Sequence, residues 1–256
     1  MKKAFSLVEL SIVLVILGLL VGGILAGQSL IRAAELRAVT TEYQRYTTAV
    51  NAFRDKYFSI PGDMPIATRF WGTAAVCPGI ETNPSSTVTC DGNGDGYVAF
   101  TTGSNEIFRF WQHMANAGLI EGQYTGVRSC AINDYCAQAG LNMPASKLST
   151  GIWGTHSRGT LAPGHATLWA GNYGSFYTFG SRTTAAAGGH EGAVLKPEEA
   201  WNIDTKLDDG KPGTGTVIST PWGGGCNNAA SSSDYGATYA LTITTPTCAL
   251  GFLRAY

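Results

Sequence analysis

The sequence predicts an α+β protein in which one very long N-terminal helix precedes a loop-rich globular part. Residues 5–27 are almost entirely apolar, and apolar residues continue to recur at helical spacing as far as Tyr57. After Pro61 the composition changes: Gly, Ser, Thr, Asn and Pro dominate, and short segments with helix or strand patterns lie between them. We therefore divide the chain into a helical segment, residues 5–59, and an extracytoplasmic globular domain, residues 60–256.

The first half of the predicted helix has the length and composition of a membrane span. The polar side chains within residues 5–26 are Ser6, Glu9 and Ser11. A helix over this range is about 30 Å long, which matches the hydrocarbon core of a bilayer. Lys2 and Lys3 precede the range and should stay in the cytoplasm by the positive-inside rule, so the rest of the chain should lie outside.

Two ordinary targeting segments explain this run less well. A secretory signal peptide has a shorter apolar region and ends at a small-x-small cleavage site, for which residues 25–27 (Leu-Ala-Gly) are a poor match. A plain membrane anchor has the right length. Neither explains Glu9, because a charged side chain at the bilayer centre costs about 2.5–3.5 kcal/mol on insertion scales. A carboxylate in this position therefore indicates a function or a partner.

The residues around Glu9 carry a family resemblance. The stretch AFSLVELSIVLVILG, residues 4–18, resembles the N-terminus of type IV pilins and of the pseudopilins of type II secretion systems. In that family a prepilin peptidase cuts on the cytoplasmic side after a small residue, usually Gly; the new N-terminal residue, usually Phe, is N-methylated, and the fifth mature residue is Glu. The resemblance implies a leader of residues 1–4, with cleavage after Ala4. Phe5 would then be methylated, and Glu9 becomes the fifth mature residue. Ala4 departs from the usual Gly, and we expect slower processing at worst.

The resemblance also implies a function. The chain would enter the inner membrane as a single-pass prepilin with its N-terminus in the cytoplasm, then polymerise through its helix into a type IV pilus or a pseudopilus, in the periplasm or on the cell surface. Glu9 would pair with the N-terminal ammonium of a neighbouring Phe5, because a subunit docked at another offset leaves the carboxylate unpaired. Alternatively, Glu9 neutralises its own N-terminus. The implied partners are copies of the chain, other pilins or pseudopilins, the prepilin peptidase, the assembly platform and, before assembly, the membrane.

A heptad-like apolar seam continues the helix beyond the membrane run. It consists of Leu36, Val39, Tyr43, Tyr46, Val50, Phe53 and Tyr57, which alternate between spacings of three and four residues. The helix should end near Ile60-Pro61-Gly62, a strong stop signal. A coiled-coil stalk would explain the seam, but we prefer packing against the protein's own globular domain. The pilin resemblance implies that arrangement too: a lollipop shape, with the exposed half of the helix laid against an antiparallel β-sheet.

The globular domain is predicted to contain two helices and four strands among long loops. One helix covers residues 105–117, with Ser104 as N-cap and Gly118 as stop. The other covers residues 197–207, with Pro197 in its first turn. The predicted strands are residues 166–170, 175–179, 214–219 and 238–244. The predicted long surface loops are residues 181–192 and 208–236.

All six cysteines lie beyond the membrane run, which is typical of disulfides formed in an oxidising compartment. Six cysteines allow about 15 pairings, and we favour the local set. Its pairs are Cys77–Cys90, Cys130–Cys136 and Cys226–Cys248. A metal cluster or free thiols are the alternatives, but no CxxC and no zinc-type spacing of Cys and His is present.

The stretch CDGNGDGYV, residues 90–98, is the candidate metal site, because D-x-N-x-D-G begins a calcium-binding loop. Its candidate oxygen ligands are Asp91, Asn93, Asp95 and the Tyr97 carbonyl. An EF-hand has Glu at the twelfth position of its loop, where this chain has Thr102. Glu106, four residues later, is the candidate for the last ligand and would require a longer loop. We predict a structural calcium ion here. The alternative is an Asx-rich turn without a metal.

The remaining features argue against an enzyme and against a nucleic-acid-binding protein. The 17 basic and 18 acidic residues leave no basic excess that would attract nucleic acid. None of the four histidines lies in a metal motif, and no phosphate-binding loop or nucleophile elbow is present. We interpret the acidic run Asp204, Asp208 and Asp209 as a solvated helix end. The alternative to a filament subunit is a membrane-anchored extracytoplasmic adhesin or sensor that does not polymerise.

Overall fold

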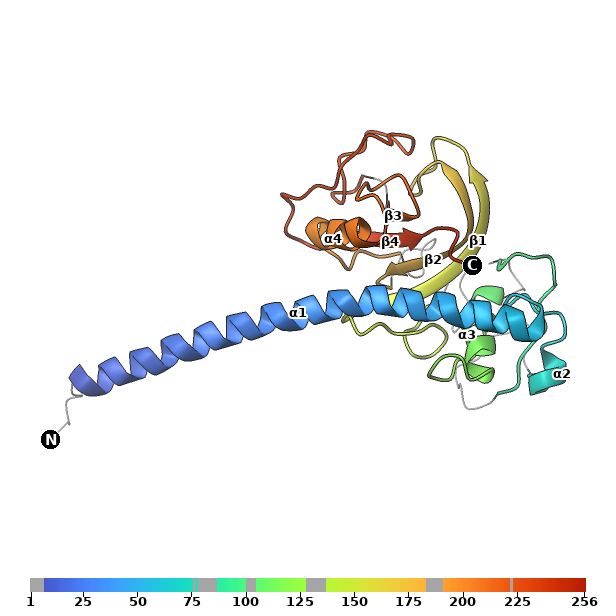
Figure 1. Cartoon of the computed structure of the whole chain (residues 1–256), viewed down its shortest axis with the longest axis horizontal. Helices are drawn as coiled ribbons and strands as arrows, with labels where there is room; N and C mark the ends of the chain where they lie inside the picture. The colour runs from blue at the N-terminus through green and yellow to red at the C-terminus, as the bar shows by residue number, and fades with distance from the viewer. Residues whose placement is uncertain are drawn as a thin grey trace.

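A computed structural model describes residues 7–75, 77, 87–99, 105–127, 137–182, 191–221 and 223–256. Figure 1 shows the long N-terminal helix α1, whose C-terminal half lies along a domain built from a β-sheet, shorter helices and long loops. The N-terminal half of α1 projects away from this domain. The predicted α+β architecture, with a long helix packed on an antiparallel sheet, is therefore confirmed.

Helix α1 runs without a break over Leu7–Tyr57. Every Leu, Ile and Val from Leu7 to Ile31 is at least 51 % exposed. From Val39 onward one stripe is buried, and it consists of Val39, Glu42, Tyr46, Ala49, Val50 and Phe53. The predicted seam therefore packs against the protein's own domain and is not free to form a coiled coil. The helix ends a little before the predicted stop, because Phe58 adopts a left-handed φ of 52° that breaks the helical hydrogen bonding.

The sheet has the strand order β1-β2-β4-β3, and each neighbouring pair is antiparallel. The strands are β1 Ile152–Leu161, β2 Gly171–Gly180, β3 Val217–Thr220 and β4 Ala249–Phe252. β1 and β2 form a long hairpin in which Ile152 pairs with Gly180 and Leu161 with Gly171. β4 comes from the C-terminus and lies between β2 and β3, so the end of the chain completes the sheet.

Two of the predicted strands are correct and two are wrong. Residues 175–179 lie within β2, and 214–219 overlap β3, which also interrupts the predicted loop 208–236. Residues 166–170 and 238–244 form turns, loops and isolated bridges instead. The sequence does not predict β1, because its Gly, Ser, His and Arg residues obscure the strand pattern, nor β4, because it is only four residues long.

The helices of the globular domain are α2 Thr68–Trp71, α3 Glu106–Asn116 and α4 Pro197–Leu207. The two longer ones lie where the sequence predicts them. The predicted N-cap of α3, Ser104, lies outside the described residues, and Asn105 immediately before the helix has a φ of 51°. At the start of α4, the Lys196 backbone N–H donates to the Glu199 carboxylate at 2.9 Å, so a first-turn acid caps the helix.

Alternation along the strands produces two apolar clusters, one on each face of the sheet. The main core contains Tyr177 and Val217 together with the buried stripe of α1 and the apolar face of α3. At its centre, the Tyr46 ring lies 5.0 Å from the Trp111 ring and 5.6 Å from the Trp153 ring, measured between centroids. The second cluster consists of Leu168, Trp169, Tyr173, Phe176, Ile218, Ala237 and Leu253. It lies on the side of the sheet away from α1.

Disulfides close two of the loop regions. The bonds Cys77–Cys90 and Cys226–Cys248 are present as predicted. Cys130 and Cys136 lie outside the described residues, so their pairing stays a prediction. The bond at Cys248 joins the residue before β4 to the loop after β3, which ties the end of the chain to the domain.

Candidate functional site

The N-terminal half of α1 presents an apolar surface that the protein's own domain does not cover. Within the described residues, α1 is the one helix long and apolar enough to cross a membrane, and none of the apolar window is buried. An apolar surface of this size is unfavourable in water. This part of the helix therefore needs lipid or other apolar helices around it.

Glu9 lies in the first turn of α1, on this exposed apolar surface. A carboxylate near a helix N-terminus interacts favourably with the helix dipole. No further ionisable side chain follows it until Arg32. Ala4 and Phe5, the predicted cleavage and methylation positions, lie outside the described residues, so the Glu9 pairing predicted with the Phe5 ammonium stays a prediction.

Arg32 marks the point at which α1 begins to contact the globular domain. Its Nε donates to Glu199 Oε1 at 2.6 Å and its Nη2 to Glu199 Oε2 at 2.7 Å, a bidentate pair between α1 and α4. Arg32 Nη1 also donates to Glu35 Oε2 at 3.1 Å. Burial alone would raise the pKa of the Glu199 carboxyl, but the hydrogen bonds from Arg32 and the Lys196 N–H lower it overall. The two helices are therefore clamped where the apolar run ends.

Glu42 forms a second anchor between α1 and the domain. This buried carboxylate accepts hydrogen bonds from Ser146 Oγ at 2.6 Å, from the Lys147 backbone N–H at 2.9 Å and from Trp153 Nε1 at 2.7 Å. These donors come from β1 and from the loop before it. One carboxylate in the buried stripe of α1 thus holds the first strand of the sheet.

The candidate calcium loop is organised by Asp63, a residue that the sequence analysis does not single out. Asp63 Oδ1 accepts the backbone N–H of Gly94 at 2.7 Å and of Asp95 at 3.1 Å, and Oδ2 accepts that of Gly96 at 2.8 Å. The contact is close: a Cβ on Gly92 would lie 2.3 Å from the Asp63 backbone carbon. The segment after α1 and the glycine-rich loop therefore fold as one unit.

Asp91 and Glu106, the outer two of the predicted calcium ligands, also accept hydrogen bonds within the protein. Asp91 accepts from the Thr68 backbone N–H at 2.8 Å and from Thr68 Oγ1 at 3.0 Å, and so holds α2. Glu106 accepts from the Asn93 N–H at 3.2 Å and from the Ala99 N–H at 3.0 Å. Burial raises the pKa of the Glu106 carboxyl, and these two hydrogen bonds lower it by less, so the pKa stays above its ordinary value.

These contacts bear on the predicted calcium ion. The oxygen donors are of the type that calcium prefers. The carboxylates of Asp91, Asp95 and Glu106, however, are too far apart to share one ion in this arrangement. In the described ranges, one trio of acidic residues has carboxylate oxygens within 4.8 Å of one another, and it lies elsewhere in the chain. Tyr97 and Asn93 lie in the same turn: the Tyr97 N–H donates to Asp95 Oδ1 at 2.9 Å, and Asn93 Nδ2 donates to Asp95 Oδ2 at 2.8 Å. Calcium binding at this loop stays a prediction.

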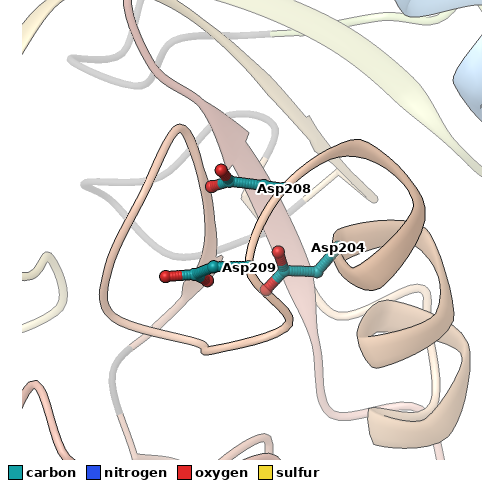
Figure 2. Close-up of side chains that lie close together, drawn as sticks. All are labelled: Asp204, Asp208 and Asp209. Carbon is teal, nitrogen blue, oxygen red and sulfur yellow. The ribbon is translucent and has the colours of Figure 1, made fainter.

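The trio is Asp204, Asp208 and Asp209, at the end of α4 (Figure 2). Asp204 is fully buried, so the interpretation of this run as a solvated helix end is wrong for that residue. Its Oδ2 accepts the Tyr239 hydroxyl at 2.8 Å, and burial raises its pKa to about 7. Asp208 accepts the backbone N–H groups of Thr216 and Val217.

Asp209, the third member of the trio, accepts hydrogen bonds from the loop that follows α4. Asp209 Oδ2 accepts the Thr214 hydroxyl at 2.5 Å, and Oδ1 accepts the Lys211 N–H at 2.9 Å. Asp204 Oδ1 also accepts the Gly210 backbone N–H at 3.1 Å, so each carboxylate of the trio holds part of the turn between α4 and β3. This arrangement explains the closeness of three acids without requiring a metal ion.

His113 is buried and serves the core. Its Nδ1 accepts the Gly62 backbone N–H at 3.0 Å, and its Nε2 lies 3.0 Å from Thr89 Oγ1. Burial lowers the pKa of its imidazole to about 3, so the ring is neutral. A histidine held in this way packs the domain and is not placed for proton transfer in a cleft.

The sequence analysis singles out Glu9 and the candidate calcium loop but not the residues that hold the domain to α1. Arg32, Glu42 and Asp63 are polar residues in ordinary helix or loop patterns, and their partners lie far along the chain. One signal was available for Glu42: it lies on the apolar seam side of α1, among residues that become buried. A polar residue on a buried stripe requires a hydrogen-bond partner.

No known protein family, curated protein or solved structure matches this chain.

Proposed function

We propose that the protein is a structural subunit of a type IV pilus or of a related pseudopilus. The observation that carries the proposal is the shape of α1. One unbroken helix has an uncovered apolar half bearing Glu9 and a second half that is fixed to the globular domain by its buried stripe. Such a chain can exchange lipid for the apolar helices of other copies without refolding.

In this proposal the chain begins as a single-pass prepilin in the inner membrane with its N-terminus in the cytoplasm. The prepilin peptidase cleaves after Ala4, and Phe5 is methylated. The assembly platform then moves the subunit into a filament with other copies and with other pilins or pseudopilins. The filament lies in the periplasm or on the cell surface.

Glu9 sets the register of the filament in this proposal. Its carboxylate pairs with the N-terminal ammonium of Phe5 on a neighbouring subunit, in a surrounding of apolar side chains. A subunit at another axial offset would leave both charges unpaired in that surrounding, which is strongly unfavourable. The anchors at Arg32 and Glu42 support the proposal, because they hold the domain at a fixed place along the helix.

A second candidate is a membrane-anchored extracytoplasmic adhesin or sensor that does not polymerise. The same exposed apolar helix supports it, since one span is enough to anchor a domain. The two candidates differ at the N-terminus: a plain anchor needs neither cleavage after Ala4 nor a partner for Glu9.

The test is the mass of the mature chain together with a substitution at Glu9. In the native cell envelope, we expect a chain that begins at methylated Phe5, measured by intact mass and N-terminal fragmentation. Glu9→Val should insert into the membrane normally but form few or no filaments in electron micrographs of sheared cell-surface fractions. Ser11→Val, which removes a neighbouring polar group, is the matched control and should assemble. An unprocessed chain, or normal filaments from Glu9→Val, would contradict the proposal and favour the anchor.

A further inference from the structure

The face of the sheet away from α1 carries a small pocket of about 260 Å³. It opens between the start of β2, the loop before β3 and the residues that follow β4. Its lining includes Trp169, Asn172, Tyr173, Gly213, Tyr235 and Arg254. The pocket lies at the second apolar cluster, which contains no residue of α1.

Two buried aromatic side chains, Trp169 and Tyr173, lie under the pocket, each only 1 % exposed, and both are fixed. Trp169 Nε1 donates to the Ser219 carbonyl at 2.8 Å, and the Tyr173 hydroxyl donates to the Trp169 carbonyl at 3.1 Å. The backbone lies directly against the indole, because a Cβ on Gly213 would lie 2.5 Å from the Trp169 ring. Glycine is therefore needed at this position for the pocket to keep its shape.

One side of the pocket is an exposed aromatic ring held in place. Tyr235 is 45 % exposed, yet its hydroxyl donates to the Ala170 carbonyl at 3.1 Å. That bond orients the ring before any ligand arrives, which lowers the entropy lost on binding. The ring offers an apolar surface to a ligand at the mouth of the pocket.

The rim carries an exposed cation. Arg254 has a left-handed φ of 51°, a rare conformation for a residue with a side chain, and its backbone N–H donates to the Tyr173 carbonyl at 3.3 Å. No ion pair or side-chain hydrogen bond joins its guanidinium to any residue in the described part of the chain. Asn172, also exposed, adds an amide to the same rim.

We propose that this pocket binds a single pyranose ring that bears a carboxylate, as in a uronic acid or a sialic acid. A sugar ring has an apolar C–H face, suited to the exposed Tyr235 ring, and a hydroxyl-rich edge, suited to Asn172. The carboxylate of the sugar pairs with the Arg254 guanidinium, whose N–H groups can donate to both carboxylate oxygens. The pocket is slightly smaller than those of drug-sized ligands, so it accepts one ring and not a lipid chain or an extended peptide.

The test measures binding of free sugars to the full chain in detergent micelles, by saturation-transfer NMR and calorimetry. The probes are glucuronic acid and N-acetylneuraminic acid, with glucose as the neutral counterpart and acetyl-dialanine as a carboxylate without a sugar ring. We expect at least one of the two acids to bind, and to bind at least about tenfold more tightly than glucose or the peptide, as expected for a charge-assisted hydrogen-bonded pair. Which acid binds identifies the source of the ligand.

Two variants test the residues. Arg254→Asn removes the cation but tolerates the left-handed backbone, and it should weaken binding of the acid by about tenfold or more. Tyr235→Ala should abolish the saturation transfer to the sugar C–H protons. The matched control is Arg69→Ala, an exposed arginine on α2 outside the pocket, which should bind as the parent does. Three results would overturn the proposal: no binding of either acid, equal or tighter binding of glucose or the peptide, or unchanged affinity in Arg254→Asn with an intact fold by circular dichroism.

Discussion

Glu42→Ala tests how the globular domain is held to α1. The substitution removes a buried carboxylate that accepts three hydrogen bonds, from Ser146 Oγ, the Lys147 N–H and Trp153 Nε1, at 2.6–2.9 Å. No described cation pairs with this carboxylate, so its charge is stabilised by those donors. The donors lie more than 100 residues further along the chain, so their loss should act on tertiary packing and leave the local helix intact.

The expected loss follows from the donors that are left behind. Trp153 is fully buried, and its indole N–H has no other acceptor within reach in the described contacts. An unsatisfied buried donor costs about 1–3 kcal/mol, and Glu42→Ala leaves one such donor, the Trp153 indole N–H, together with the half-buried Ser146 hydroxyl. We therefore expect the free energy of unfolding to fall by about 2–4 kcal/mol. Glu42→Gln keeps one acceptor oxygen and should lose less, about 1–2 kcal/mol.

The assay is chemical denaturation of the full chain in detergent micelles, followed by tryptophan fluorescence at neutral pH. Asp55→Ala, an exposed acid on the same helix, is the matched control and should change the free energy by less than about 0.5 kcal/mol. The reasoning is refuted if Glu42→Ala costs no more than this control, or if the Gln and Ala variants are equally destabilised.

Three further predictions concern charged groups. Arg32→Met breaks the bidentate pair with Glu199 and should lower the free energy of unfolding by about 1–3 kcal/mol; a value unchanged within error in the same denaturation assay would contradict the clamp. Asp91→Ala combined with Asp95→Ala should abolish any gain in melting temperature caused by added calcium; a parent protein that shows no such gain would count against the calcium site. Burial raises the pKa of Asp204 from 3.8 to about 7, so the native state holds a proton there that the unfolded state releases. The free energy of unfolding should therefore fall as the pH rises from about 4 to 7, and Asp204→Asn should remove that part of the slope in pH-dependent denaturation.

The parts of the fold that the sequence predicts correctly are those with local causes. α4 begins at Pro197 with acids in its first turn, and α1 combines an apolar run with a regular seam. The strands show the opposite case. Residues 166–170 contain Leu and Trp because they pack in the second apolar cluster, and not because they pair as a strand. β4 is four residues long and depends on β2 and β3 for its hydrogen bonds, so no local pattern identifies it.

The candidate sites divide in the same way. The position of Glu9 in an apolar helix and the D-x-N-x-D-G spacing can be recognised from residues that are neighbours in the chain. The role of Asp63 as the acceptor for the glycine-rich loop depends on a turn that brings together residues about 30 positions apart. Of the predicted calcium ligands, Asp91 accepts hydrogen bonds from Thr68 in another segment, which spacing alone does not reveal.

The apolar run, the length of α1 and the position of Glu9 on it follow from local hydrophobicity and periodicity, since a helix closes its hydrogen bonds within four residues. The strand order, the anchors at Arg32 and Glu42 and the pocket beside Trp169 arise from contacts between segments that are distant in the chain. Their partners are selected by how the whole chain packs, because buried polar groups must find donors or acceptors wherever the fold places them. For that reason the long apolar helix can be predicted from the amino-acid sequence, whereas the attachment of the domain to it is known from the folded structure.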